Sequence, residues 1–244
     1  MALKKISPQS TDRLACLVIG PAGIGKTSLI RTLCGEEFNG QTWEKKSQPE
    51  KVCVLSAEAG LLSVRDLVVA GQVEGYEIGS LEDFRDAQLM CMGANFKQEG
   101  YRWIFIDSLT EISSRCSESL QKKYPEKNDS FKLWGEYNQL MTDIIKSFRD
   151  MTDFNVVFTC LEAHDKDADG IARLVPDVAG SGVKNRLVSY FDEVLYMQSI
   201  RAQDGKPWTW FSTSSPVGVA KDRSGKLDKF EMPNLLSIQH KILG

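Results

Sequence analysis

Residues that build metal and disulfide sites are scarce in this sequence. It holds two histidines, and no two of its six cysteines follow the C-x-x-C spacing. Several of the cysteines stand in apolar, strand-like runs, at positions 16, 34, 53, 91, 116 and 160. We therefore expect reduced and mostly buried thiols, as in a cytoplasmic protein, and no metal cluster.

Long apolar runs and an excess of positive charge are also missing. No apolar run approaches the length of a membrane span, and the first residues, MALKKISPQSTDR, are too polar for a signal peptide. We therefore expect no membrane contact. The formal net charge is −3, unlike the strongly basic balance of domains that coat nucleic acids. Any binding of nucleic acid must come from local basic patches or from their repetition along an oligomer.

Strands and helices alternate up to about residue 161, and strands dominate afterwards. Buried strands are expected at 14–19, 51–58, 102–107 and 154–161, with continuous rather than alternating apolar residues. Such strands indicate a parallel sheet with helices on both faces. We therefore predict an α/β fold in a single domain, residues 1–244, with an antiparallel hairpin extending one edge around an Asp204–Gly205 turn. The expected helices are 26–34, 80–96, 131–151 and 233–243, and 36–50 is expected to be a polar loop.

The segment GPAGIGKTS follows the first strand and carries the complete G-x-x-x-x-G-K-T signature of a phosphate-binding P-loop. Its glycines let backbone N–H groups surround a phosphate, and the start of the next helix adds a favourable dipole. Lys26 can reach the β- and γ-phosphates, and the Thr27 hydroxyl can bind Mg²⁺. The plainer alternative is a glycine turn with a surface lysine. The predicted nucleotide-binding residues are Gly20, Pro21, Ala22, Gly23, Ile24, Gly25, Lys26, Thr27 and Ser28.

Two carboxylates end strands that neighbour this loop. Asp107 ends the strand WIFID, where open α/β sheets place their ligand-binding groups, so we expect it to hold Mg²⁺ together with Thr27. Ser108 follows it, so this position lacks the glutamate that activates water in many P-loop ATPases. Glu58, at the end of KVCVLSAE, is the candidate general base instead. The alternatives are an Asp107 that caps the next turn and a Glu58 that is an exposed loop residue.

Three segments together resemble the ATPase core of RecA-type recombinases: GPAGIGKTSL, VCVLSAEAGLLS and RWIFIDSLTEI. The layout is especially similar to small phage proteins that carry this core alone, including the RecA-like group of single-strand annealing proteins. The resemblance covers about residues 14–223. It implies that the protein binds ATP and Mg²⁺, that Glu58 is the general base, and that Asp107 holds the metal.

The resemblance also implies two DNA-binding loops and a basic finger. The loops would fall in 113–130 and 164–187, where lysines and arginines would neutralise phosphates of single-stranded DNA. Lys221 and Arg223 would reach the γ-phosphate held by a neighbouring subunit. The plainer alternatives are solvated loops and a basic turn before an edge strand. The candidate DNA-binding residues are Arg115, Lys122, Lys123, Lys127, Arg173, Lys184 and Arg186.

The sequence departs from the RecA pattern at two places. RecA-like proteins end the 154–161 strand with an amide side chain that senses the γ-phosphate, whereas this chain reads TCLEAHDKD. His164 or Glu162 is the candidate substitute, and a satisfied surface histidine is the alternative. About thirteen residues precede the first strand, too few for the RecA subunit hook. We therefore expect assembly through another contact, such as the tail 1–13.

These observations favour a RecA-core ATPase that binds single-stranded DNA and promotes annealing or recombination as an oligomer, either a ring or a filament. A second hypothesis is an ATP-dependent switch that recruits a single-strand-binding, replication or packaging protein with little affinity for DNA. A third is a small-molecule phosphotransferase, with 164–187 as an arginine-bearing lid. The sequence identifies no residue that contacts the adenine base.

Overall fold

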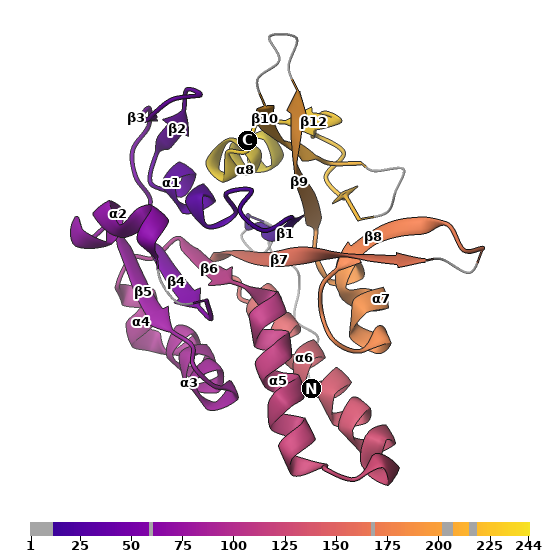
Figure 1. The fold of residues 1–244 in the computed structure, drawn as a ribbon. Helices are drawn as coiled ribbons and strands as arrows, with labels where there is room; N and C mark the ends of the chain where they lie inside the picture. The colour runs from indigo at the N-terminus through magenta and orange to yellow at the C-terminus, as the bar shows by residue number, and fades with distance from the viewer. Residues whose placement is uncertain (1–11, 59–60, 167–168, 202–206, 215–218) are drawn as a thin grey trace, which may run out of the picture.

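In the part of the chain that the structure describes, the fold is built on a ten-stranded sheet whose central strands run parallel (Figure 1). The computed structural model describes residues 12–58, 61–166, 169–201, 207–214 and 219–244. The strand order is β12-β10-β9-β1-β7-β6-β4-β5, with β11 paired to β9 and β8 paired to β7. The strands are β1 (Ala15–Gly20), β4 (Val52–Ser56), β5 (Val73–Glu77), β6 (Trp103–Asp107), β7 (Asn155–Lys166), β8 (Ala172–Pro176), β9 (Glu193–Arg201), β10 (Pro207–Ser212), β11 (Lys221–Asp222) and β12 (Phe230–Glu231).

The parallel strands bring distant segments to one edge of the sheet. In the strand register Gly20 pairs with Leu161 and Ser56 pairs with Asp107. Because β1, β7, β6 and β4 all run in the same direction, their C-terminal ends meet there. The edge that should bind a ligand therefore carries the P-loop, Asp107 and the segment with Glu58, as the sequence predicts.

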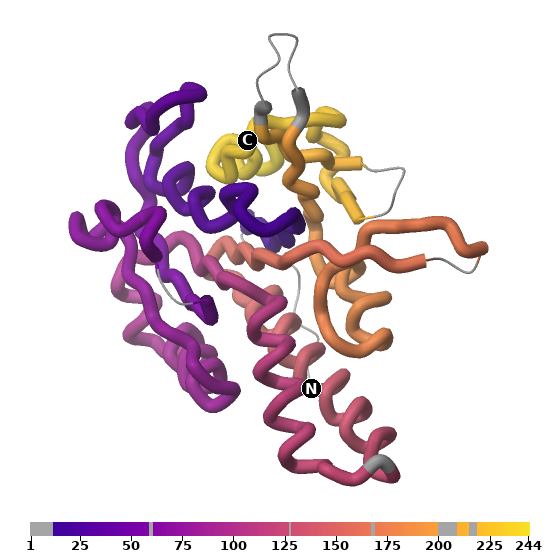
Figure 2. Tube along the Cα trace, viewed as in Figure 1, coloured from indigo at the N-terminus to yellow at the C-terminus, as the bar shows by residue number. Residues whose placement is uncertain are grey.

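Helices cover both faces of this sheet, which confirms the predicted α/β fold. One hydrophobic cluster joins Leu17 and Ile106 to α3, α5, α6 and α7, and the other joins Val18 and Phe105 to α1, α2 and α8. Figure 2 traces α5 and α6 as a pair that extends beyond the sheet. The helices are η2 (Thr27–Leu29), α1 (Ile30–Leu33), η3 (Leu62–Val64), α2 (Arg65–Val69), α3 (Leu81–Met92), α4 (Ala94–Gln98), α5 (Leu109–Lys123), η4 (Lys127–Asp129), α6 (Ser130–Arg149), α7 (Ser181–Tyr190) and α8 (Leu235–Leu243).

The prediction of a loop over 113–130 is wrong, because α5 occupies most of that range. The Ser108 side chain caps this helix by accepting a hydrogen bond from the N–H of Glu111. Its buried residues Leu109, Ile112 and Cys116 recur at helical spacing and pack against α3 and α6. The many polar residues of this range form the exposed face of an amphipathic helix.

Two further segments predicted as loops form antiparallel hairpins. The range 36–50 contains β2 (Glu36–Phe38) and β3 (Trp43–Lys45), joined by a turn in which Asn39 accepts hydrogen bonds from two backbone N–H groups. The range 164–187 begins with a continuation of β7 that pairs with β8, and Gly170 adopts a φ of 78° near the turn. Asn39–Gly40 and Asp169–Gly170 are the hairpin signals that the sequence offered at these places.

The structure confirms the predicted hairpin at the edge of the sheet and the buried, reduced cysteines. The β9–β10 hairpin extends the sheet as expected, although Asp204 and Gly205 lie outside the described residues, as do residues 1–11 of the tail. All six cysteines are buried and free of disulfides. No helix in the described part of the chain is long and apolar enough to cross a membrane.

We expect Phe158→Ala to lower the free energy of unfolding by about 3–5 kcal/mol, because it leaves a cavity in the centre of the sheet. Phe158 is fully buried, and its ring centroid lies 5.3 Å from that of Phe191 and 6.2 Å from that of Phe148. Denaturant unfolding measures the loss. Leu62→Ala, at a side chain that is 83% exposed, is the control and should change it by less than about 0.5 kcal/mol.

Candidate nucleotide-hydrolysis site

The P-loop leaves β1 through a backbone that requires glycine at defined positions. A Cβ atom on Gly20 would lie 2.6 Å from the carbonyl oxygen of Met197, so β9 leaves no room for a side chain there. Gly25 has a φ of 102°, in the left-handed region that other residues rarely adopt. The N–H groups of Gly23, Ile24 and Gly25 donate to no acceptor among the described residues. Such free N–H groups in a turn form a cradle for an anion such as phosphate.

Lys26 lies within this cradle. Its side chain is buried, and Nζ donates hydrogen bonds to the carbonyl oxygens of Gly20 at 2.9 Å and Pro21 at 2.8 Å. Burial lowers the pKa of Lys26, and the neighbouring carboxylates of Asp107 and Glu58 oppose this shift. The fold thus holds a cation where a phosphate chain would lie.

Thr27 and Asp107 form the polar centre of the site. Thr27 Oγ1 donates a hydrogen bond of 2.6 Å to Asp107 Oδ2, and the Thr159 hydroxyl donates to the other carboxylate oxygen. Burial raises the pKa of Asp107, while the bonds from Thr159 and Thr27 oppose this shift. A hydroxyl beside a carboxylate is a donor set that suits Mg²⁺, so these two residues fit the predicted metal.

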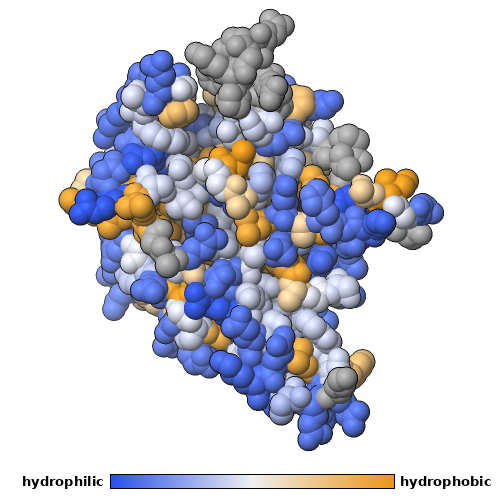
Figure 3. All heavy atoms as spheres, in the orientation of Figure 1, coloured by the Kyte–Doolittle hydropathy of each residue, from blue (hydrophilic) through white to orange (hydrophobic). Residues whose placement is uncertain are grey.

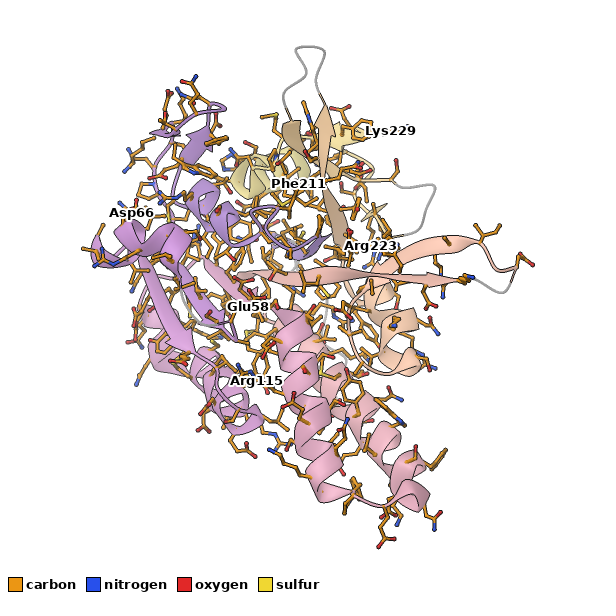
Figure 4. All side chains as sticks on the ribbon, in the orientation of Figure 1. Glu58, Asp66, Arg115, Phe211, Arg223 and Lys229 are labelled. Atoms are coloured by element: carbon orange, nitrogen blue, oxygen red, sulfur yellow. The ribbon has the colours of Figure 1, made fainter. Side chains whose placement is uncertain are left out.

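Glu58 lies next to this centre. Its backbone follows β4, and the N–H of Ala57 donates to the carbonyl oxygen of Asp107 at 2.6 Å. Ser108 Oγ donates a hydrogen bond of 2.7 Å to Glu58 Oε1. Ser108 thus orients the carboxylate that the sequence predicts as general base. Figure 4 shows Glu58 beside the N-terminal end of α5.

Arg115 has a position that the sequence did not predict. Its guanidinium donates to the carbonyl oxygens of Ala57, at 2.9 Å, and Gly79, and it forms an ion pair with Glu111 at 3.3 Å. Arg115 therefore fixes the segment that immediately precedes Glu58 (Figure 4). We assign Arg115 a positioning role, because its guanidinium binds these carbonyl oxygens and Glu111 instead of extending from a loop toward DNA.

A sequence profile of the AAA domain family matches residues 12–224. The chain belongs to this family of P-loop NTPases. The match spans the P-loop, Asp107, Glu58 and the segment with Lys221 and Arg223. No curated protein matches the chain. The mostly parallel sheet of this AAA domain is consistent with a RecA-like core.

Of the two sensor candidates, Glu162 lies nearer to the site of the AAA domain. Its carboxylate is among the groups that raise the pKa of Lys26. Burial and then the Glu162 carboxylate raise the pKa of Tyr196, on β9, to about 12. His164, two residues further along β7, is exposed. Glu162 is therefore close enough to Lys26 to influence its pKa, whereas nothing in the described contacts ties His164 to the phosphate cradle.

The remaining basic candidates lie on four separate elements. Lys122 and Lys123 are at the far end of α5, about 20 Å along the helix axis from Ser108, and Lys123 is paired with Glu136 at 2.7 Å. Arg173, on β8, lies opposite Asp165 of β7 at 3.9 Å. The others are Lys184 and Arg186, which lie on α7, and Lys127, whose backbone lies in η4 and whose side chain is outside the described residues.

Lys221 and Arg223 lie toward the N-terminal ends of the parallel strands, whereas the P-loop lies at their C-terminal ends. Lys221 pairs with Val194, which pairs with Leu17, so about 10 Å of strand separates this level from Gly20. Lys221 Nζ donates to backbone carbonyl oxygens, and Arg223 forms an ion pair with Asp192 at 2.6 Å while remaining 56% exposed. Neither residue enters the site of its own chain, and action on a neighbouring subunit stays a prediction.

Glu58→Gln should lower kcat for ATP hydrolysis by about 10²- to 10⁴-fold, because the amide cannot accept a proton from water. Affinity for the nucleotide should persist, since Lys26 and the P-loop remain. Single-turnover hydrolysis and nucleotide binding, measured side by side, separate the two effects. Glu118→Gln, on the exposed face of α5, is the matched control, and equal losses in both variants would contradict the assignment.

A second prediction concerns Glu193, which is buried beneath the turn that carries Arg223. Burial, followed by the Asp222 charge, raises the pKa of Glu193 to about 8, and the N–H of Ser224 donates to its Oε1 at 3.2 Å. The folded state therefore holds this proton more tightly than the unfolded state, so its contribution to stability is lost as pH rises toward 8.

Glu193→Gln removes this ionisation, so the variant should gain stability relative to the wild-type protein between pH 5 and 8. Urea unfolding at unit steps of pH gives the difference. Glu82→Gln, on the exposed first turn of α3, is the control and should show no such trend. A difference for Glu193→Gln that is constant with pH would contradict the assigned pKa.

Proposed function

We propose that this AAA domain is a Mg²⁺-dependent ATPase that binds single-stranded DNA and promotes annealing or recombination as a homo-oligomer. The convergence of Lys26, Thr27, Asp107 and Glu58 at one edge of the sheet carries the catalytic part of the proposal. The DNA-binding part rests on the RecA-like arrangement and on the basic residues of the β7–β8 hairpin and α7.

Each residue of the site has a defined task in hydrolysis. The free N–H groups of the P-loop and the Lys26 ammonium bind and orient the phosphate chain. Thr27 and Asp107 would hold Mg²⁺, and the ion would supply neutralisation of charge on the phosphate oxygens. Glu58 accepts the proton of the attacking water, and Ser108 keeps its carboxylate oriented.

The path from the site to the proposed DNA surface runs through β7. Thr159 of this strand donates a hydrogen bond to Asp107, and the same strand continues through Glu162 into the β7–β8 hairpin with Arg173. The return segment is fixed to the strand by a 2.8 Å hydrogen bond from the N–H of Asp177 to Leu161. A change in nucleotide state would therefore reach the hairpin and α7 through a short, continuous connection.

The position of Arg223 supports the proposal of an oligomer. Its guanidinium is 56% exposed at a level of the sheet about 10 Å of strand from Gly20, which leaves it accessible to a phosphate bound by another copy. A basic side chain supplied in this way would neutralise charge in the transition state and couple hydrolysis to assembly. A ring or a filament would satisfy this geometry.

The second hypothesis, an ATP-dependent switch that recruits a replication or packaging partner, is favoured by two observations. Arg115 is engaged with carbonyl oxygens beside Glu58, and Arg173 lies opposite Asp165. These two cations are therefore less available to DNA than the sequence suggests. The net charge of −3 also disfavours extensive binding of nucleic acid.

We expect ATP hydrolysis to be stimulated by single-stranded DNA more than by duplex, and to lose this stimulation as salt rises. Lys26→Ala should reduce turnover by about 10²-fold or more, because the phosphate chain loses its buried cation. Lys97→Ala, at an exposed lysine paired with Asp153, is the control. Steady-state phosphate release measures the DNA stimulation and the rates of both variants. A hydrolysis rate that does not change with DNA at low salt would favour the ATP-dependent switch.

A further inference from the structure

A cavity of about 510 Å³ adjoins the P-loop on the side of Ser28. Gly25 and Ser28 form its floor, the β2–β3 hairpin forms one wall, and the segment between β12 and α8 forms the opposite wall. Its volume lies within the range of small-molecule sites. Figure 3 shows apolar surface between the β2–β3 hairpin and the C-terminal elements.

The walls carry large apolar side chains that remain partly exposed. Phe38 is 47% exposed and Met232 is 45% exposed, although both belong to a lined cavity rather than to a convex surface. Phe38 and Trp43 lie with their ring centroids 5.3 Å apart. Large apolar groups that stay accessible in a cavity indicate a ligand with a flat apolar face.

The indole of Trp43 is held in place by Arg31. The Arg31 guanidinium lies 5.8 Å from the centre of its ring, and Arg31 is itself fixed by ion pairs with Glu36, at 2.9 Å, and with Asp66. The hairpin is also attached at its base, where the N–H groups of Lys46 and Ser47 donate to the carbonyl oxygen of Gly35. The aromatic wall is therefore preorganised, which reduces the entropic cost of binding.

The direction of the phosphate chain follows from the position of Glu58, which lines a second cavity that no P-loop residue lines. The second cavity contains Ser56 and Glu58, so the phosphate that water attacks lies on that side. The first cavity contains Ser28 and has no contact with Glu58 among its lining residues. Since the nucleoside is attached to the opposite end of the chain from the γ-phosphate, it must leave the cradle toward the first cavity.

We propose that this cavity binds the purine base of the nucleotide. The aromatic pair Trp43 and Phe38 of the β2–β3 hairpin would lie on one side of the base, and Met232 of the segment before α8 on the other. This assignment rests on the proposed function, because it takes the P-loop as the site of the phosphates. The carboxylate of Glu37 and the amide of Asn234, joined by a 3.2 Å hydrogen bond, lie at the same cavity and provide polar partners for the base edge.

The test compares two probes on the full chain by calorimetric titration with Mg²⁺. A non-hydrolysable ATP analogue contacts both the cradle and the cavity, whereas inorganic tripolyphosphate contacts the cradle alone. Trp43→Ala and Met232→Ala should weaken binding of the analogue, for Trp43→Ala by about 5- to 150-fold, as expected for the loss of a stacked base. Binding of tripolyphosphate should remain unchanged.

Matched controls are Trp134→Ala on α6 and Met92→Ala on α3, which are accessible side chains outside the cavity, and neither should affect either probe. Trp43→Phe should retain most of the affinity and covers the case in which Trp43→Ala fails to fold. Cavity variants that bind the analogue as the wild type does, or that weaken both probes equally, would overturn the assignment. A wild-type chain that binds neither probe would instead refute the proposed function.

Discussion

The hydrogen bond between Thr27 and Asp107 joins two segments that are 80 residues apart, and the arrangement of the site depends on it. It forms because β1 and β6 run parallel on either side of β7, so that their C-terminal ends share one edge. The same register brings the N–H of Ala57 to the carbonyl oxygen of Asp107 and thereby places Glu58 beside Ser108. The order of the parallel strands thus brings these residues together, and the Thr27–Asp107 hydrogen bond then fixes their side chains.

The charges of Lys26 and Asp107 at this edge are stabilised by each other and by neighbouring groups rather than by solvent. Burial disfavours the charged forms of both Lys26 and Asp107, and each charge partly restores the other. Two hydroxyl groups, from Thr27 and Thr159, stabilise the carboxylate further. A phosphate chain with Mg²⁺ brings charge of both signs and fits such a site better than a neutral ligand does. The buried, unequally compensated charges therefore favour binding of a nucleotide over a purely structural role.

The sequence could predict this centre because its signals are local. The glycines of the P-loop, the strand that ends at Asp107 and the strand that ends before Glu58 are each recognisable without tertiary information. The failures are of a different kind. Polar residues between Leu109 and Lys123 conceal an amphipathic helix, and the role of Arg115 depends on carbonyl oxygens of two other elements. The cavity proposed to bind the base could not be predicted, because its walls, from residues 37–43 and 231–237, meet only in the folded chain.

Different parts of the chain line the two cavities, and we assign hydrolysis to one cavity and base binding to the other. Strand ends β4 and β6 provide the chemistry on the Glu58 side, where the residues match a general pattern of P-loop enzymes. The nucleoside side is built from a short hairpin and from a segment beyond residue 224, where the match to the AAA family ends. A hydrolytic centre constrained by strand order can therefore remain fixed while the outer walls vary. In the proposed assignment, the β2–β3 hairpin and the segment before α8 determine nucleotide preference, and the strand ends of the sheet determine hydrolysis.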